Sequence, residues 1–242
     1  MIKRLIFASL LLGSSVAMAD RPVLAVAEFT NDATNAGWWG GGIGRELASM
    51  LASELAAINA FTIVERERID HILREQDLGA SGRVRSDSAA EIGQLTGAQY
   101  IVVGTVTDYS ENTRRTAGGI NMRGINIGGR GTNLGVGGNR TEAYIAVDVQ
   151  VINATTGEMA HVRTIEGRTQ DGGVSLRAQR GRFGGDLSHQ NDTPAGEAIR
   201  AALIEITDFL ECEMVLQNSA CRAKYQARED TRRDRTRNAI RF

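Results

Sequence analysis

A glycine-rich tract at residues 118–138 constrains the fold of this chain more than any other feature of its sequence. It reads GGINMRGINIGGRGTNLGVGG, with nine glycines in 21 positions and no acidic residue. Glycine inside a helix or a strand is destabilising by roughly 0.5–1 kcal/mol relative to alanine. Because the tract lies between two apolar segments, we expect it to be an insertion between core elements.

The segments around this tract have the residue patterns of β-strands. Residues 143–153, AYIAVDVQVIN, alternate apolar and polar side chains, which is typical of a strand with one buried face. Compact apolar runs at 23–29, 61–66 and 98–110 predict three further strands. The turn signal NATTGE predicts that residues 159–169 return antiparallel to the alternating strand. The buried face of that strand is expected to consist of Ala143, Ile145, Val147, Val149 and Val151.

Helical patterns separate the first strands. Apolar residues recur at helical spacing over 43–58, which predicts an amphipathic helix. A shorter helix is expected over 67–76, with Ile69, Ile72 and Leu73 on its buried face.

Two capping signals predict further helices. Ser88 and Glu91 have the spacing of a capping box, which indicates a helix over 88–95. Thr193 and Pro194 precede a last amphipathic segment and indicate where its helix begins. Together, the elements predict a mixed α/β fold built in layers.

The chain is expected to divide into a signal peptide (1–19), one α/β domain (20–221) and a basic tail (222–242). Two glycine-rich insertions, 111–142 and 168–192, interrupt the domain and are longer than ordinary hairpin connections. The tail has eight Lys or Arg and three Asp or Glu residues. It is interpreted as a solvated, partly helical or disordered end, or as a contact for an acidic partner or anionic lipid.

The first residues have the pattern of a secretory signal. Lys3 and Arg4 precede an apolar run at 5–12, and small residues precede the expected cleavage before Asp20. The mature chain is therefore expected to be exported. No cysteine lies near this position, so the sequence does not predict a lipoprotein. Removing the signal changes the formal net charge from -1 to -3, and nothing in this total favours a nucleic-acid partner.

Cys212 and Cys221 are the only cysteines, and in an oxidising compartment they are expected to form a disulfide. Free or intermolecular thiols are the alternative. A zinc site is disfavoured because none of His71, His161 and His189 has ligand spacing to them.

The motifs of common enzymes are missing from the sequence. The glycine-rich tracts lack the lysine of a phosphate loop, and GWWGGGIG (37–44) is more simply a tight connection from a strand to a helix. No serine lies in a G-x-S-x-G turn. Glu65 and Glu67 flank arginines, which indicates surface ion pairs. We therefore expect no enzyme activity and no cofactor.

The order of the segments resembles the CsgG family, which includes the curli secretion channel of the bacterial outer membrane. The resemblance rests on VLAVAEFTN, FTIVERERIDHILREQ, TGAQYIVVGTVTDYS and AVDVQVINATTGEMAHVRT, which together cover roughly residues 23–168. It implies a periplasmic α/β domain that assembles into a homo-oligomeric ring. In channel members, each subunit sends two β-hairpins into the membrane, where they close into one barrel.

The two insertions stand where the family's hairpins leave the domain. The resemblance thus implies that they form barrel strands, while soluble loops are the alternative interpretation. Their alternation is imperfect, because Arg180 falls in the apolar phase of the second insertion. The expected membrane-facing residues are Ile120, Met122, Leu134, Val136, Val174 and Leu176.

Channel members also narrow the pore with a loop between the first strand and the first helix. By side-chain type, the resemblance assigns a pore constriction here to Asn35, Trp38 and Trp39. Tryptophans packed at a helix start or at a subunit contact are the alternative. The channel members are lipoproteins, and this chain departs from them because it lacks the acceptor cysteine.

The sequence therefore predicts a component of export or assembly in the periplasm or outer membrane, acting as a ring-forming channel or a channel-associated subunit. Its expected partners are secreted fibre or adhesin subunits and accessory assembly proteins. The alternative is a soluble periplasmic adaptor that resembles activators of peptidoglycan synthases or flagellar accessory domains.

Overall fold

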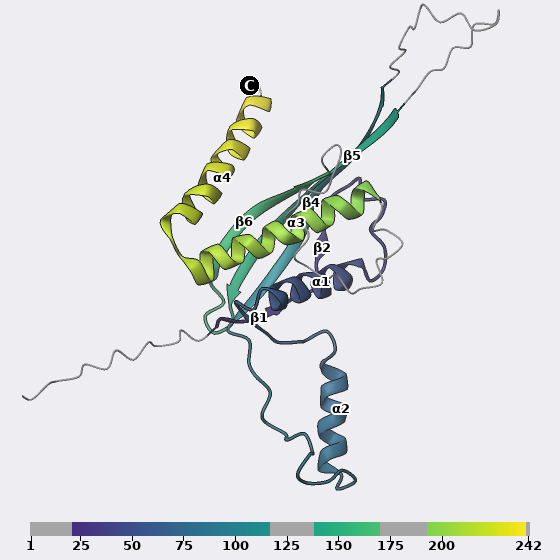
Figure 1. Cartoon of the computed structure of the whole chain (residues 1–242), viewed down its shortest axis with the longest axis vertical. Helices are drawn as coiled ribbons and strands as arrows, with labels where there is room; N and C mark the ends of the chain where they lie inside the picture. Colours follow the sequence, from purple (N-terminus) through teal and green to yellow (C-terminus); the bar gives the residue numbers. More distant parts are fainter. Residues whose placement is uncertain (1–20, 117–137, 170–192, 241–242) are drawn as a thin grey trace, which may run out of the picture.

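The computed structural model describes residues 21–116, 138–169 and 193–240 (Figure 1). The expected signal peptide lies outside the described residues. The same holds for all six expected membrane-facing residues, Ile120, Met122, Leu134, Val136, Val174 and Leu176.

A mixed β-sheet forms the centre of the domain. Its strand order is β3-β1-β4-β5-β6, and the short β2 pairs with β4. β1 is parallel to both of its neighbours, whereas β4, β5 and β6 form an antiparallel meander. The predicted mixed α/β fold is therefore confirmed. The strands are β1 (Val23–Val26), β2 (Thr30–Asn31), β3 (Thr62–Ile63), β4 (Tyr100–Thr116), β5 (Gly138–Asn153) and β6 (Met159–Arg168).

Helices α1 (Ile43–Ala57) and α3 (Pro194–Glu211) cover one face of this sheet and share its hydrophobic core (Figure 1). The predicted inner face of β5 is confirmed, because all five of its alternating apolar residues are buried. α3 begins as expected: the Thr193 side chain accepts a hydrogen bond from the backbone N–H of Gly196 at 3.1 Å, and Pro194 occupies the first turn. β6 packs closely on α3, since a Cβ atom at Gly167 would clash with the Ala198 carbonyl oxygen.

β4 and β5 are longer than the sequence pattern predicts. Their antiparallel pairing continues to Thr116 opposite Gly138, although β6 ends at Arg168, opposite Tyr144. Residues 111–116 and 138–143 therefore form a two-stranded ribbon that projects away from the helices (Figure 1).

A bulge interrupts the pairing of β4 with β5 below this ribbon. Val106 pairs with Val147, but Asp108 pairs with Ala146, so Thr107 is the extra residue in β4. The bulge changes which side chains of β4 face the helices: Val106 does so below it and Tyr109 above it.

The segment between β3 and β4 corrects two predictions. Helix α2 (Ile69–Ala80) forms, but Ile69 and Ile72 are only half-buried and Leu73 is exposed, because α2 stands apart from the sheet (Figure 1). The helix predicted over 88–95 is absent, and this segment forms turns and extended chain. Ser88 donates its hydroxyl hydrogen bond to the Arg85 carbonyl at 3.3 Å instead of capping a helix.

The C-terminal region is more ordered than predicted. After α3, a π-helical turn (Cys212–Leu216) leads into α4 (Ser219–Ala239), which includes nearly all of the basic tail. None of the described helices combines the length and the apolar composition that crossing a membrane requires.

Candidate functional site

The connection between β2 and α1 lies beside β4, below the ribbon. The backbone N–H groups of Asp32 and Ala33 donate to the Val106 carbonyl at 2.8 and 3.2 Å. These bonds fix the start of the connection next to the bulge. The predicted constriction residues therefore lie close to the end of the domain from which the ribbon projects.

The two tryptophans of this connection pack inward. The Trp38 ring lies 5.5 Å from the Trp39 ring and 5.5 Å from the Tyr109 ring, both measured between centroids, in edge-on arrangements. Both tryptophans are partly buried against the core, whereas Asn35 is exposed. The packing is the arrangement expected of tryptophans at a helix start.

Tyr109 completes this aromatic cluster, although no motif in the sequence indicated it. Its hydroxyl donates to Glu111 at 3.0 Å. Burial, together with this hydrogen bond, raises the pKa of Tyr109 to about 12, so the phenol stays neutral at physiological pH. The cluster therefore anchors the base of the ribbon to the start of α1.

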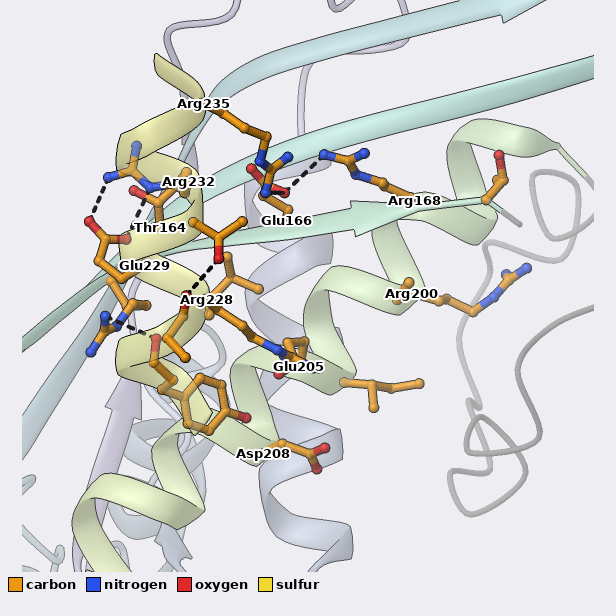
Figure 2. Close-up of a pocket in the computed structure, with 18 of the residues that line it drawn as sticks. Thr164, Glu166, Arg168, Arg200, Glu205, Asp208, Arg228, Glu229, Arg232 and Arg235 are labelled. Atoms are coloured by element: carbon orange, nitrogen blue, oxygen red, sulfur yellow. Dashed lines mark hydrogen bonds and ion pairs between the residues drawn. The ribbon is translucent and has the colours of Figure 1, made fainter. Parts of the chain in front are cut away.

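A second candidate site is a cleft of about 730 Å³ between β6, α3 and α4 (Figure 2). Its walls include the apolar side chains of Ile165 and Ile204, while most of its polar groups are arginines and carboxylates. No sequence motif indicated this cleft, because it forms only when the basic tail folds as a helix beside the sheet.

Covalent and aromatic contacts join α4 to the domain. A disulfide links Cys212, at the end of α3, to Cys221 in the first turn of α4, with 5.9 Å between their Cα atoms. The Tyr225 ring packs edge-on against Phe209, with 5.3 Å between centroids. Burial raises the pKa of Tyr225 well above its usual range.

Ion pairs connect α4 to both neighbouring elements. Arg228 pairs with Glu205 of α3, and Arg235 approaches Glu166 of β6 at 3.4 Å. Arg168 contacts the same Glu166 carboxylate at 3.0 Å (Figure 2). Carboxylates of β6 and α3 thus hold three of the arginines around the cleft, Arg168, Arg228 and Arg235.

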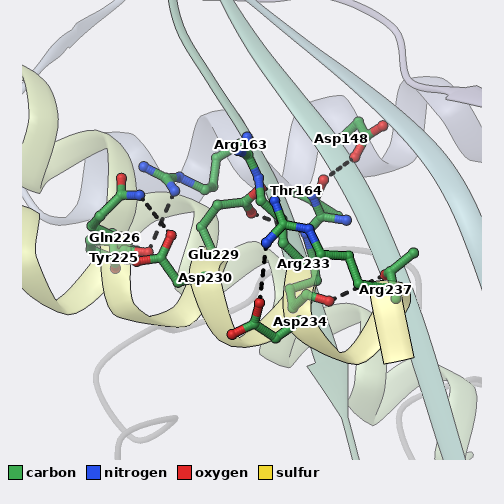
Figure 3. A network of polar contacts seen from close by, with 12 residues as sticks. Asp148, Arg163, Thr164, Tyr225, Gln226, Glu229, Asp230, Arg233, Asp234 and Arg237 are labelled. Carbon is green, nitrogen blue, oxygen red and sulfur yellow. Dashed lines mark hydrogen bonds and ion pairs between the residues drawn. The ribbon is translucent and has the colours of Figure 1, made fainter. Parts of the chain in front are cut away.

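Glu229 is the buried carboxylate of α4 (Figure 3). It accepts hydrogen bonds from Arg232, at 2.8 and 3.0 Å, and from Arg233, at 2.7 Å. The bonds from Arg232 are the main cause that lowers the pKa of Glu229 to about 2. Helical spacings of three and four residues bring these groups together, a signal that was present in the sequence.

The described residues contain no group of three or more His, Cys, Asp and Glu side chains that could hold a metal ion. His161 lies 3.9 Å from Glu213, and burial lowers the pKa of this histidine. This pair links β6 to the turn between α3 and α4. The contacts described at the two candidate sites are aromatic packing, hydrogen bonds and ion pairs.

The chain belongs to the family described as Curli production assembly/transport component CsgG, whose family model matches residues 9–240. It is therefore a CsgG-like secretion and assembly component. A search of curated proteins found no match.

Among solved structures, the chain is similar to a hypothetical protein from Chlamydia trachomatis (12% identity, TM-score 0.42, covering 79% of this chain and 96% of that one). It is also similar to the PelC dodecamer from Paraburkholderia phytofirmans (14% identity, TM-score 0.32, 77% and 86% covered). A third is the LpoB C-terminal domain from Salmonella enterica (16% identity, TM-score 0.29, 64% and 87% covered). Each likeness is weak, and the family assignment rests on the sequence match.

Proposed function

We propose that this chain forms a homo-oligomeric ring in the periplasm, whose paired extensions enter the outer membrane and surround a passive conduit for secreted subunits. The observation that carries the proposal is the projecting ribbon, where β4 and β5 stay paired to Thr116 and Gly138 beyond the body of the domain. Such a conduit requires no catalytic chemistry.

Both insertions begin at the same end of the sheet. The first joins Thr116 to Gly138, the last described pair of the ribbon, and the second follows Thr169, whose backbone N–H donates to the Ala143 carbonyl at 3.0 Å. In the proposed ring, the hairpins would meet in a closed wall, since backbone in lipid needs paired neighbours. Their lipid-facing side would include Ile120, Met122, Leu134, Val136, Val174 and Leu176.

The constriction is proposed for the connection below the ribbon. Asn35 is exposed there and would project into the conduit, while Trp38 and Trp39 would hold the connection against β4. This assignment gives the tryptophans a supporting role and leaves the asparagine as the polar group of the constriction.

Cell fractionation and negative-stain imaging test the proposal. Rings that require detergent, together with conductance in planar bilayers, are expected of the wild type. Replacement of residues 117–137 by Asn-Gly should leave a folded domain, because Thr116 and Gly138 are already paired and a two-residue turn closes such a hairpin. This variant should lose both membrane retention and conductance.

A matched pair of substitutions tests the assigned lipid-facing phase. Leu134→Arg should impair insertion, since arginine on the lipid face costs about 2–4 kcal/mol near the midplane. Asn133→Arg, which would lie on the opposite face of the proposed strand, should insert normally. A wild-type monomer released by osmotic shock would refute the channel and favour the soluble adaptor.

A further inference from the structure

β1 and the start of β4 have no polar face. β1 reads VLAV and the first four residues of β4 read YIVV, so both segments are apolar on the two sides of the sheet. β5 differs, because Asp148 and Gln150 alternate with its buried residues. Continuous apolar runs are typical of strands that are covered on both faces. These strands therefore indicate that the outer face of the sheet, opposite to α1 and α3, also needs a cover.

The strand register shows which aliphatic side chains lie on this outer face, since residues directly opposite each other project to the same side. One row across the sheet consists of Ala25, Ile101, Ile152 and Met159, and the next row contains Val103 and Val162. We call these six residues the outer patch. They are not part of the core under α1 and α3, and Met159 and Val162 are 63% and 59% exposed. Of the described helices, α1 and α3 lie on the other face, α2 stands apart and α4 runs beside β6 (Figure 1).

α2 and the chain that returns from it form an arm, residues 65–98, that stands apart from the sheet (Figure 1). Two contacts align its halves: Arg66 donates to the Thr96 carbonyl at 2.9 Å, and Gln76 donates to the Glu91 carbonyl at 3.1 Å. Within the described chain, the hydrogen bonds and ion pairs of the arm join only its own residues. The arm can therefore move as a unit without breaking a bond to the domain.

Five aliphatic side chains of the arm lie between these two contacts. Ile69 and Ile72 are half-buried, and Leu73, Ile92 and Leu95 are exposed, Ile92 by 65%. We call these five residues the arm patch. Exposed aliphatic residues that gather in this way mark an interaction surface.

The connections between the parallel strands indicate that the arm is the cover of the outer patch. α1 joins β1 to its neighbour β3, and the arm joins β3 to β4, which is two strands back across the sheet. Nearly all such crossovers are right-handed. Two crossovers of the same hand that run in opposite directions place their helices on opposite faces of a sheet. Since α1 lies on the inner face, the topology places α2 on the outer face.

We propose that α2 docks on the outer patch of its own sheet, and that the extended arm is the open state of this closure. The tether allows it: five residues, 64–68, join β3 to α2 and span up to about 17 Å, whereas packed layers lie roughly 10 Å apart. Closure buries the arm patch and the outer patch together, and opening exposes both to a partner. The inference concerns a single domain and does not depend on the proposed ring.

A cysteine pair in the full chain tests the closure. Leu73→Cys/Val103→Cys links the two patches and should crosslink within one chain at least about tenfold faster than Leu73→Cys/Ala56→Cys. The control differs because Ala56 is exposed on α1, which lies on the other face. Peptide mass spectrometry without reductant separates the new link from the native disulfide. Circular dichroism should show native folding in both variants.

Charge in the arm patch should oppose closure. Adding Ile92→Asp/Leu95→Asp to the first cysteine pair should slow its crosslinking by roughly tenfold or more, because carboxylates would be buried without partners. Adding Ser86→Asp/Ser88→Asp, at exposed positions beyond the end of α2, should leave the rate unchanged. A link between two chains would overturn the proposal in favour of a second copy, and a rate equal to that of the Ala56 control would also overturn it. Neither result bears on the ring, which cell fractionation tests separately.

Discussion

α3 and α4 follow each other in the chain and both lie beside β6, but they are held by different forces. α3 buries a continuous apolar stripe, which includes Leu203 and Ile206, in the core of the domain. α4 buries only Tyr225 and Glu229 and is otherwise held by the disulfide and by arginine–carboxylate pairs. Two neighbouring helices should therefore respond differently to mutation, pH and salt.

The largest expected effect is the loss of a core side chain from α3. Leu203→Ala should lower the free energy of unfolding by about 2–5 kcal/mol, because it leaves a cavity at a fully packed position. Urea unfolding followed by circular dichroism measures the change. Leu216→Ala, at an exposed position, is the control and should change it by less than about 0.5 kcal/mol. Equal losses would contradict the assigned core.

Removal of the disulfide should release α4 while α3 stays folded. Cys212→Ser/Cys221→Ser is expected to cost roughly 2–3 kcal/mol through the lost chain constraint. Limited trypsin digestion, read by mass spectrometry, should then cut first at the arginines of α4. A wild-type digestion pattern would show that the side-chain contacts alone hold this helix.

A smaller effect is expected from acid, through Glu229. Its folded pKa of about 2 is below the ordinary value of 4.5, so its stabilisation is present above pH 4.5 and disappears as the pH falls towards 2. The contribution is roughly 1.5–3 kcal/mol, the usual range for a hydrogen bond to a charged group. Glu229→Gln should abolish most of this acid dependence in protease-protection measurements, and Asp230→Asn, at an exposed acid of α4, should preserve it.

The smallest effect should come from salt. The Arg228–Glu205 and Arg235–Glu166 pairs are partly exposed, so each contributes at most about 1 kcal/mol and is screened at high ionic strength. Raising NaCl from 0.05 to 1 M should speed proteolysis of α4 and leave hydrogen exchange in α3 unchanged. Equal acceleration in both helices would remove the distinction between them.

The same contrast explains what the sequence could predict. The alternation of β5 and the cap at Thr193 are local patterns that tertiary packing reinforces, and both were predicted correctly. The spacing of Glu229 and Arg232 supports a helix whether or not it docks, and Tyr225 alone does not define an apolar face. The sequence therefore predicted at most a partly helical tail, and it did not predict that this helix docks beside β6 or that a cleft forms there.

For α2, the sequence predicted a buried face that the described chain does not bury. Ile69, Ile72 and Leu73 have the spacing of a buried helical face, yet the described arrangement leaves them half-buried or exposed. A periodic pattern indicates that a face needs a partner, but it does not indicate which molecule supplies the partner. The helix predicted from the capping-box spacing of Ser88 and Glu91 is also absent, since the Ser88 hydroxyl donates to the Arg85 carbonyl instead.

The bulge at Thr107 reverses the alternation of side chains between the two faces of β4. Side chains of a β-strand alternate between faces with a period of two, so one extra residue exchanges the faces of everything beyond it. Deleting Thr107 would leave Val102 and Val106 in the core and reverse the sides on which Asp108, Tyr109 and Glu111 project. A single residue therefore sets the orientation of the ribbon independently of the core beneath it.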